Sequence, residues 1–237
     1  MKSFQDYRLF YYAEPTGKSV TDGKNPSDWT AYEGVDPTRP FTEIKGMYSE
    51  PKAARTYCQL NKRYYEIPEG EPIFLLSYSD VKFILAEAVV RGLVAGDAKT
   101  YYEEGVKAAM KFTADMTPDG FDHGMPITDA YITTYLQSSK IKFASNVDAQ
   151  IEQIIMQKYL SLFFQEPWTG FFEMRRTGVP NIPVNPATNK NEPKDKLPVR
   201  WMYPQNEYDY NSVNVQEAVQ RQYGGDDSPN NVMWILK

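Results

Sequence analysis

The chain has 237 residues and a formal net charge of −5 at pH 7. This charge argues against a nucleic-acid-binding surface, because phosphate neutralisation needs a concentrated stripe of Lys and Arg. Hydrophobic residues make up 41% and charged residues 24% of the chain, which is typical of globular domains. The only histidine is His123 and the only cysteine is Cys58, so neither a zinc site nor an internal disulfide is expected.

No membrane segment or leader is recognisable in the sequence. No apolar run approaches the roughly 18–20 residues that span a bilayer. The first residues also lack the charged region and apolar core of a signal peptide.

Residues 1–72 form a segment rich in Pro, Gly, Asp and Tyr that lacks a sustained helical period. We expect long loops here with short extended pieces, among them residues 56–64. Loops of this length in a compact domain usually have a function or belong to a larger structure.

Residues 73–237 form the helical part of the chain. Ser77 and Asp80 fit a capping box, which predicts a helix that ends at Gly96. Asp97 is positioned to cap a second helix, which ends before Pro118. The apolar stripes of the two helices are Val81, Ile84, Leu85, Ala88 and Ala95, and then Ala98, Tyr101, Tyr102, Gly105, Ala108, Phe112 and Met116. The short turn between them predicts an antiparallel αα-hairpin.

The spacing of small residues in this hairpin matches a tetratricopeptide unit. Ala86, Ala98 and Gly105 would let the two helices approach closely, with Leu85 and Tyr102 filling the adjacent groove. One hairpin cannot bury its outer face alone, so further helices are needed beside it.

A third helix is predicted over residues 147–165. Ser145 and Asp148 form its expected capping box, and Pro167 is expected to stop it and to begin the next helical segment. That segment covers residues 168–177 and ends at Gly178, a typical stop signal.

The remainder is less regular. Residues 179–211 form a loop rich in Pro and Asn, in which alternating apolar residues suggest an extended piece over 197–203. A last helix is expected over 214–222. The apolar tail 232–236 is too short to span a membrane, and we expect it to pack into the core.

The sequence predicts no catalytic residue, metal site or cofactor. His123 has no Gly-x-Ser-x-Gly elbow to accompany it and is flanked by turn residues. The adjacent acidic pairs 103–104 and 226–227 read as a solvated helix face and a turn, so neither resembles the two facing carboxylates of a glycosidase. The loop 189–192 lacks EF-hand spacing, and no phosphate-binding glycine motif occurs.

Aromatic residues account for 14% of the chain, with 18 Tyr, 12 Phe and 4 Trp. An aromatic face complements the C–H face of a sugar ring, although most of these residues occupy helical stripes that fill a core. Trp29 and Tyr32 instead lie in a polar loop. Together with Tyr48 and Arg39 from the same region, they are the predicted ligand-binding residues.

Several stretches resemble the SusD/RagB family, in its SusD-like branch. They are DYRLFYYA at 6–13, FLLSY at 74–78, VKFILAEA at 81–88, QKYL at 157–160, EPW at 166–168, FEMRRTGVP at 172–180, LPVRWMYP at 197–204 and NEY at 206–208. This resemblance extends over nearly the whole chain. It implies a mainly α fold of tetratricopeptide-like helical hairpins with long irregular loops and few short strands.

The resemblance also implies a function. Members of this family are longer and begin with a lipoprotein signal and an acylated cysteine, so Met1 resembles an internal methionine and residues 1–237 resemble the C-terminal portion of a single SusD-like domain. The family implies lipid anchoring at the outer-membrane surface and a TonB-dependent, SusC-like transporter as partner. It also implies non-enzymatic capture of glycans or peptides. The matched residues Trp168, Arg175, Arg176 and Trp201 are expected to hold the fold.

Two other functions stay open at this point. The hairpin could serve as a scaffold for a protein partner without any small-molecule ligand. A glycoside hydrolase needs only two well-placed carboxylates, and a distant pair is not visible in a sequence.

Overall fold

The computed structural model describes residues 1–166 and 168–236, and the protein is mainly α-helical within them, as predicted. Its α-helices are α1 (Arg8–Tyr12), α2 (Gly17–Thr21), α3 (Phe41–Ser49), α4 (Tyr78–Val90), α5 (Ala98–Asp115), α6 (Asp129–Gln137), α7 (Val147–Ser161), α8 (Thr169–Thr177), α9 (Gln205–Tyr210) and α10 (Ser212–Tyr223). In this part of the chain, β pairing is limited to one isolated bridge between Ala13 and Leu60. The extended pieces predicted over 56–64 and 197–203 therefore form no regular strand.

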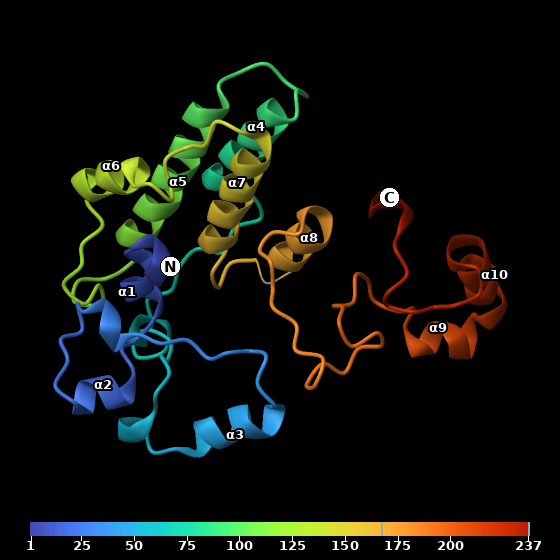
Figure 1. The fold of residues 1–237 in the computed structure, drawn as a ribbon, viewed down its shortest axis with the longest axis horizontal. Helices are drawn as coiled ribbons and strands as arrows, with labels where there is room; N and C mark the ends of the chain where they lie inside the picture. The colour runs from blue at the N-terminus through green and yellow to red at the C-terminus, as the bar shows by residue number, and fades with distance from the viewer. Residues whose placement is uncertain (167, 237) are drawn as a thin grey trace.

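The chain forms three regions (Figure 1). Helices α4, α5, α6 and α7 lie together as a bundle. Below them lies the loop-rich N-terminal segment with α1, α2 and α3. The C-terminal residues extend away from both regions as an arm that includes α9 and α10, and α8 lies between the arm and the bundle (Figure 1).

Helix α4 begins with the predicted capping box. The Asp80 amide donates to Ser77 Oγ (3.0 Å), and the Ser77 amide donates to Asp80 Oδ2 (3.3 Å). The predicted end at Gly96 is wrong, because α4 ends six residues earlier, at Val90. Gly92 adopts a φ of 70°, and the Leu93 amide donates back to the Ala88 carbonyl (2.9 Å). This left-handed glycine stops the helix.

The face that α4 buries also differs from the predicted apolar stripe. Phe83 and Ala86 are buried, whereas Ile84 is 47% exposed. Helix α5 lies against the Phe83 face, so contact with the partner helix determines which side is buried. The predicted hairpin itself is confirmed.

Close approach of α4 and α5 depends on Gly105. A Cβ built on Gly105 would lie 2.7 Å from a ring carbon of Phe83, so a larger residue cannot fit without movement. The small residue was predicted, but the aromatic ring that it accommodates is Phe83. Tyr102 of the same helix is also buried, and its hydroxyl donates to the Ile141 carbonyl (3.0 Å).

Helix α7 is capped by Asn146, whose Oδ1 accepts from the Ala149 amide (2.9 Å). The predicted capping box of Ser145 and Asp148 is therefore wrong, and α7 also ends at Ser161 before the predicted boundary at 165. Pro167 lies outside the described residues. Helix α8 and its Gly178 C-cap, with a φ of 77°, agree with prediction.

Ion pairs attach α8 to the bundle. The Arg176 guanidinium donates to both carboxylate oxygens of Glu87 on α4, at 2.6 and 2.7 Å. Glu173 accepts from Lys158 Nζ on α7 at 2.7 Å. One turn of α8 thus contacts two bundle helices, which supports the expected structural role of Arg176.

Several short helices were not predicted. Helices α1, α2 and α3 lie in the segment expected to be loops, α6 was missed, and α9 lies inside the predicted loop 179–211. Helices of five to nine residues are not stable alone, so tertiary contacts decide whether they form. Gly17 of α2 illustrates this, because a Cβ there would collide with the Lys52 carbonyl. The tail also departs from prediction, since Trp234 is 77% exposed and does not enter the core.

Candidate ligand-binding groove

The structure does not bring the four predicted ligand residues together. The Trp29 ring is half-buried and packs on Phe10, with ring centres 4.6 Å apart. Tyr32 is only 1% exposed, and its hydroxyl donates to the Pro26 carbonyl (2.7 Å). The polar loop folds both rings onto the core. Tyr32 consequently presents no ring face to a ligand in this structure.

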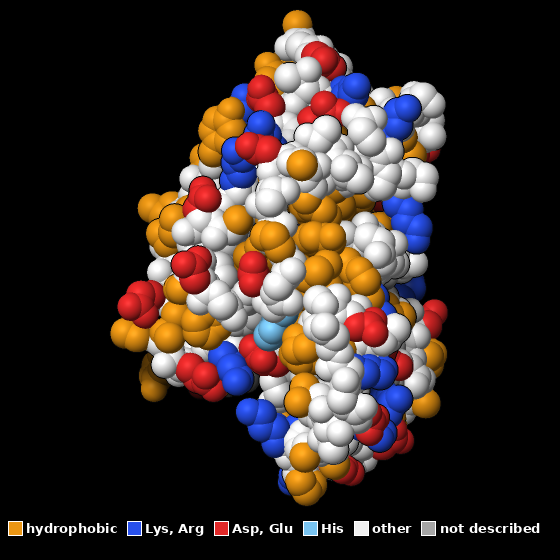
Figure 2. Space-filling view, turned by 90° about the vertical axis from the view of Figure 1, so that its left-hand side faces the viewer, with side chains coloured by type: hydrophobic (Ala, Val, Ile, Leu, Met, Phe, Trp, Pro, Cys, Tyr) orange, Lys and Arg blue, Asp and Glu red, His pale blue; other side chains and the backbone are white. Residues whose placement is uncertain are grey.

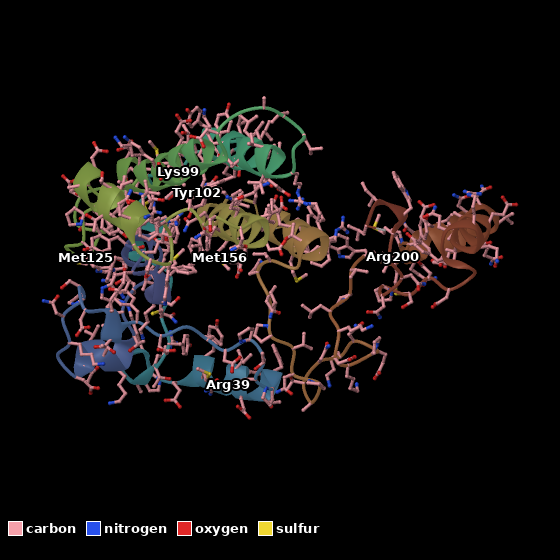
Figure 3. All side chains as sticks on the ribbon, turned by 45° about the horizontal axis from the view of Figure 1, so that its top comes forward. Arg39, Lys99, Tyr102, Met125, Met156 and Arg200 are labelled. Carbon is pink, nitrogen blue, oxygen red and sulfur yellow. The ribbon has the colours of Figure 1, made fainter. Side chains whose placement is uncertain are left out.

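Tyr48 and Arg39 lie at opposite ends of α3. Arg39 is exposed in the turn that precedes the helix, apart from the bundle residue Tyr102 (Figure 3). Tyr48 occupies the last turn and is 57% exposed. From the start of α3 to Tyr48 the helix alone spans roughly 10 Å at 1.5 Å per residue, and Arg39 precedes that start, so the two residues do not form one compact site. Tyr48 borders a hollow of the surface.

That hollow and a neighbouring one form the tyrosine groove, in which Gln59 and Tyr65 border both hollows. The cavity volumes are about 540 Å³ and about 390 Å³. The first is mainly apolar, and its lining includes Leu9, Tyr12, Tyr48, Leu60 and Phe163. More charged and polar residues line the second, among them Glu14, Thr21, Lys52 and Lys62.

The backbone between Gln59 and Tyr65 is fixed by contacts with the start of the chain. The Glu14 amide donates to the Gln59 carbonyl (2.9 Å), and the Asn61 amide donates to the Tyr12 carbonyl (3.0 Å). Asn61 is fully buried, and its Nδ2 donates to the Phe10 carbonyl (3.0 Å). Tyr65 thus follows a rigidly held turn, although it is itself 56% exposed.

Several polar groups of the groove are free to bind a ligand. Within residues 1–166 and 168–236, Gln59 Nε2, the Tyr65 hydroxyl and the ammonium groups of Lys52 and Lys62 make neither a hydrogen bond nor an ion pair. Gln59 Oε1, by contrast, accepts from Arg55 Nη1 (3.0 Å). This hydrogen bond orients the side-chain amide of Gln59 and leaves its Nε2 donor without a protein partner among the described residues.

Glu14 supplies an acceptor to the same groove. Its Oε1 accepts from the Lys62 amide (2.9 Å) and lies 3.5 Å from His123 Nε2. Burial tends to raise the pKa of Glu14, but the hydrogen bonds and charges of His123 and Lys62 outweigh it and lower that pKa. Glu14 is therefore a carboxylate at neutral pH. The pale-blue side chain at the surface in Figure 2 is His123.

The Tyr65 hydroxyl stays protonated beside this carboxylate. Partial burial and the negative charges of Glu14 and Glu66 raise the pKa of Tyr65. Tyr65 was absent from the predicted set, as were Glu14 and Gln59. A tyrosine in a polar segment, the signal that selected Trp29, could have found Tyr65. Nothing in the sequence links Glu14 to it, because that contact is tertiary.

A second aromatic surface lies on the C-terminal arm, in the region of Arg200 (Figure 3). Its rings are already in contact with one another, since Trp201 lies edge-to-face on Trp168 with centres 5.0 Å apart. Its amides are also occupied, because Asn189 Nδ2 donates to the carbonyls of Lys194 and Lys196, both at 2.8 Å. These groups hold the arm together, which leaves the tyrosine groove as the better ligand site.

The described residues place limits on other chemistry. Nowhere in them do three or more His, Cys, Asp or Glu side chains gather as metal ligands. None of the helices described has the length and apolar character needed to cross a membrane. Exposed tyrosine rings beside free donors and a carboxylate acceptor are instead suited to a polyhydroxylated ligand with an apolar face.

The family model described as "Starch-binding associating with outer membrane" (SusD-like) matches residues 1–204. The chain belongs to the SusD-like family. It is similar to a solved SusD homologue from Bacteroides fragilis, with 44% sequence identity and a TM-score of 0.93. The match covers 100% of this chain and 50% of that one. No curated protein matches the chain.

Two further solved structures extend the comparison of this SusD-like chain. An outer membrane protein from Bacteroides vulgatus, whose name links it to nutrient binding, is 36% identical with a TM-score of 0.86, covering 99% of this chain and 49% of that one. A chitin-binding protein is 28% identical with a TM-score of 0.72, covering 98% and 47% of the two chains. The chain thus spans about half the length of these relatives.

Proposed function

We propose that this SusD-like chain binds oligosaccharides in the tyrosine groove and catalyses no reaction on them. The observation that carries the proposal is the pair of exposed rings, Tyr48 and Tyr65, beside the unpaired amide donor of Gln59. The rings offer apolar faces to sugar C–H groups, and the polar groups can bind hydroxyls. Of the predicted residues, we retain Tyr48 as a proposed ligand residue, whereas Trp29 and Tyr32 pack on the core and Arg39 is not in the groove lining.

The expected affinity is modest. A disaccharide that buries on the order of 200 Å² of apolar surface gains roughly 5 kcal/mol before costs. Loss of translational freedom offsets much of this gain. A Kd between millimolar and micromolar follows, which suits a protein that passes its cargo onward.

The biological setting is part of the same proposal. The family description supports association with the outer membrane, and we propose lipid anchoring at the cell surface and delivery of glycans to a TonB-dependent, SusC-like transporter. Peptides are the second class of cargo. A glycosidase is disfavoured because Glu14, the carboxylate of the groove, has its Oε1 bound by the Lys62 amide and lines the groove without a second carboxylate among the described lining residues.

Apolar surface outside the groove supports the proposal that the chain is the C-terminal portion of a longer SusD-like domain. Leu75 is fully exposed, and Leu76 and Trp168 are more than half exposed. Large exposed apolar side chains that lie close together usually mark a surface that packs against another part of a protein. The solved relatives are about twice as long as this chain. We propose that the other half of such a domain covers them.

Isothermal titration tests the binding function. Maltoheptaose and chitohexaose are suitable probes, because the family description names starch and one relative is named for chitin. Binding of either probe, with loss in a Tyr65→Ala variant, supports the proposal. Failure of both glycans and of a tryptic peptide mixture to bind contradicts it, and measurable hydrolysis of either glycan would revive the glycosidase alternative.

A further inference from the structure

The two carboxylate oxygens of Glu14 differ in their contacts. Oε1 accepts from the Lys62 amide (2.9 Å) and lies 3.5 Å from His123 Nε2. Oε2 makes no hydrogen bond among the described residues, yet it is not one of the buried polar atoms that lack a partner, so solvent reaches it. The side chain is only 16% exposed. Glu14, which lines the second hollow, therefore has one carboxylate oxygen that solvent reaches.

The opposite charge is available in the same hollow. The Lys62 amide donates to Glu14, whereas the Lys62 ammonium makes no hydrogen bond or ion pair among the described residues, and Lys62 lines the cavity of about 390 Å³. Tyr65 borders this cavity with an exposed ring. Residues that carry an acceptor, a donor and an aromatic ring thus line the same hollow.

We propose that Glu14 Oε2 is the residue atom that accepts hydrogen bonds from neighbouring hydroxyls of a sugar seated on Tyr65. The Lys62 ammonium donates to one of the same hydroxyl oxygens. His123 is a positioning residue that holds the carboxylate in this orientation. This role rests on the proposed function and adds to it the ligand class that this end of the groove selects: an unmodified vicinal diol of a neutral sugar.

A carboxylate is suited to this task because it only accepts hydrogen bonds. Two adjacent hydroxyls can both donate to one oxygen, and hydrogen bonds to a charged group contribute more than those to a neutral one. A sugar that bears a carboxylate at this position would meet like charge. An ester or ether in place of the hydroxyls would leave Glu14 unpaired.

The experiment uses the 237-residue chain with three probes: maltoheptaose, whose rings carry adjacent free hydroxyls, chitohexaose, whose internal rings carry an acetamido group instead of one of them, and per-O-methylated maltoheptaose. Per-O-methylation keeps the glucose rings but removes every hydroxyl donor. We expect Glu14→Gln to weaken binding of maltoheptaose at least about tenfold, and to affect binding of chitohexaose less. Lys62→Met, which keeps the backbone amide that holds Glu14, should weaken it severalfold. The methylated probe should bind wild type poorly and show no further loss in Glu14→Gln.

His123→Gln tests positioning. It should weaken binding less than Glu14→Gln does, and in the Glu14→Gln background it should have no further effect, a coupling that a purely structural role would not produce. Lys18→Met is the matched control, because the Lys18 ammonium pairs with Asp22 (3.0 Å) and does not line the hollow. Thermal unfolding of each variant verifies that the fold is kept.

The outcomes separate this inference from the proposed function. If Tyr65→Ala abolishes binding while Glu14→Gln leaves it unchanged, the groove binds glycan and the role of Glu14 is overturned. Equal loss of natural and methylated probe in Glu14→Gln overturns it too. If wild type binds neither natural glycan, or if neither Tyr65→Ala nor Glu14→Gln changes binding, both the groove and the role of Glu14 are rejected.

Discussion

Asp6 and Arg8 form an ion pair that is completely buried, with Arg8 Nη2 2.6 Å from Asp6 Oδ2 and neither side chain exposed to solvent. The pair joins α1 to two bundle helices. Arg8 Nη2 also donates to Gln157 Oε1 on α7 (2.8 Å), and the Tyr135 hydroxyl on α6 donates to Asp6 Oδ2 (3.0 Å). The motif that resembles the family at residues 6–13 therefore has a structural role in this chain.

Replacement of Asp6 should strongly destabilise the protein. Asp6→Asn leaves a buried guanidinium without its counter-charge, which costs about 3–5 kcal/mol of unfolding free energy. Urea unfolding at pH 7 measures the loss. Asp22→Asn is the matched control, because the exposed Lys18–Asp22 pair contributes about 0–1 kcal/mol. Similar losses in the two variants would contradict the prediction.

The effect of Asp6 should also depend on pH. Burial tends to raise the pKa of Asp6, but the charge and hydrogen bonds of Arg8 outweigh it and lower that pKa. Because the folded-state pKa lies below the unfolded value, the stabilisation is complete at pH values above the ordinary carboxyl pKa of about 3.9 and is lost as the pH falls towards the folded pKa. The stability difference between wild type and Asp6→Asn should therefore shrink as the pH falls from roughly 5 to roughly 2. A constant difference would argue against this linkage.

Contact between α4 and α5 predicts the effect of enlarging Gly105. Gly105→Ala places a methyl group against the Phe83 ring, and overpacking should cost about 1–3 kcal/mol, partly offset by the better helix propensity of Ala. Gly46→Ala on α3 is the control, since its Cβ meets nothing within 4 Å, and it should stabilise the protein by about 0.5–1 kcal/mol. Chemical unfolding compares the two. Phe83→Leu should rescue Gly105→Ala, and absence of this rescue would place the strain elsewhere.

The ion pairs of Arg176 connect α8 to the bundle. We therefore expect its replacement by an uncharged long side chain to lower the stability. Arg176→Met removes the bidentate ion pair with Glu87 and the ion pair with Glu173. Because the guanidinium is 41% exposed, we expect a loss of roughly 1–2 kcal/mol. Arg91→Met should cost only about 0.3–0.5 kcal/mol, since Arg91 makes just an i,i+4 pair with Glu87. Equal effects in thermal unfolding would show that the link between helices is unimportant.

Cys58 should react slowly with alkylating reagents. Burial, and to a lesser extent the nearby carboxylates of Glu33 and Glu14, raise the pKa of the Cys58 thiol to about 11. At pH 8 the folded protein then contains far less thiolate than the unfolded chain. Allowing for the greater intrinsic reactivity of a high-pKa thiolate, alkylation should be slower on the order of tenfold. Iodoacetamide labelling with and without denaturant measures this ratio, and equal rates would contradict the raised pKa.

The groove predicts opposite effects for two aromatic residues that look alike in the sequence. Tyr48→Ala should weaken binding of maltoheptaose or chitohexaose roughly five- to tenfold, on the basis of about 50 Å² of lost apolar contact, and should leave stability nearly unchanged. Trp29→Ala should lower the unfolding free energy by about 1–3 kcal/mol while the folded fraction binds normally. Titration together with thermal unfolding distinguishes them. Loss of binding in Trp29→Ala alone would move the site to the Trp29 loop.

The sequence determined the features that depend on neighbouring residues. The Ser77–Asp80 capping box, the Gly178 stop, the α4–α5 hairpin and the need for a small residue at Gly105 all follow from local hydrogen bonding and helical spacing. These interactions connect residues within a turn or two, so the pattern that encodes them is contiguous. The long motifs shared with SusD-like proteins also predicted the family to which the chain belongs.

Tertiary structure alone decided the remaining features. Whether Tyr32 lies in the core and Tyr65 at the surface depends on how the loop 1–72 folds back on the bundle, and neither residue carries that information locally. The same holds for Glu14, whose partners Lys62 and His123 lie 48 and 109 residues away along the chain. Side chains are buried or exposed by the segments that pack on them, so the members of a binding groove become known only when those segments meet.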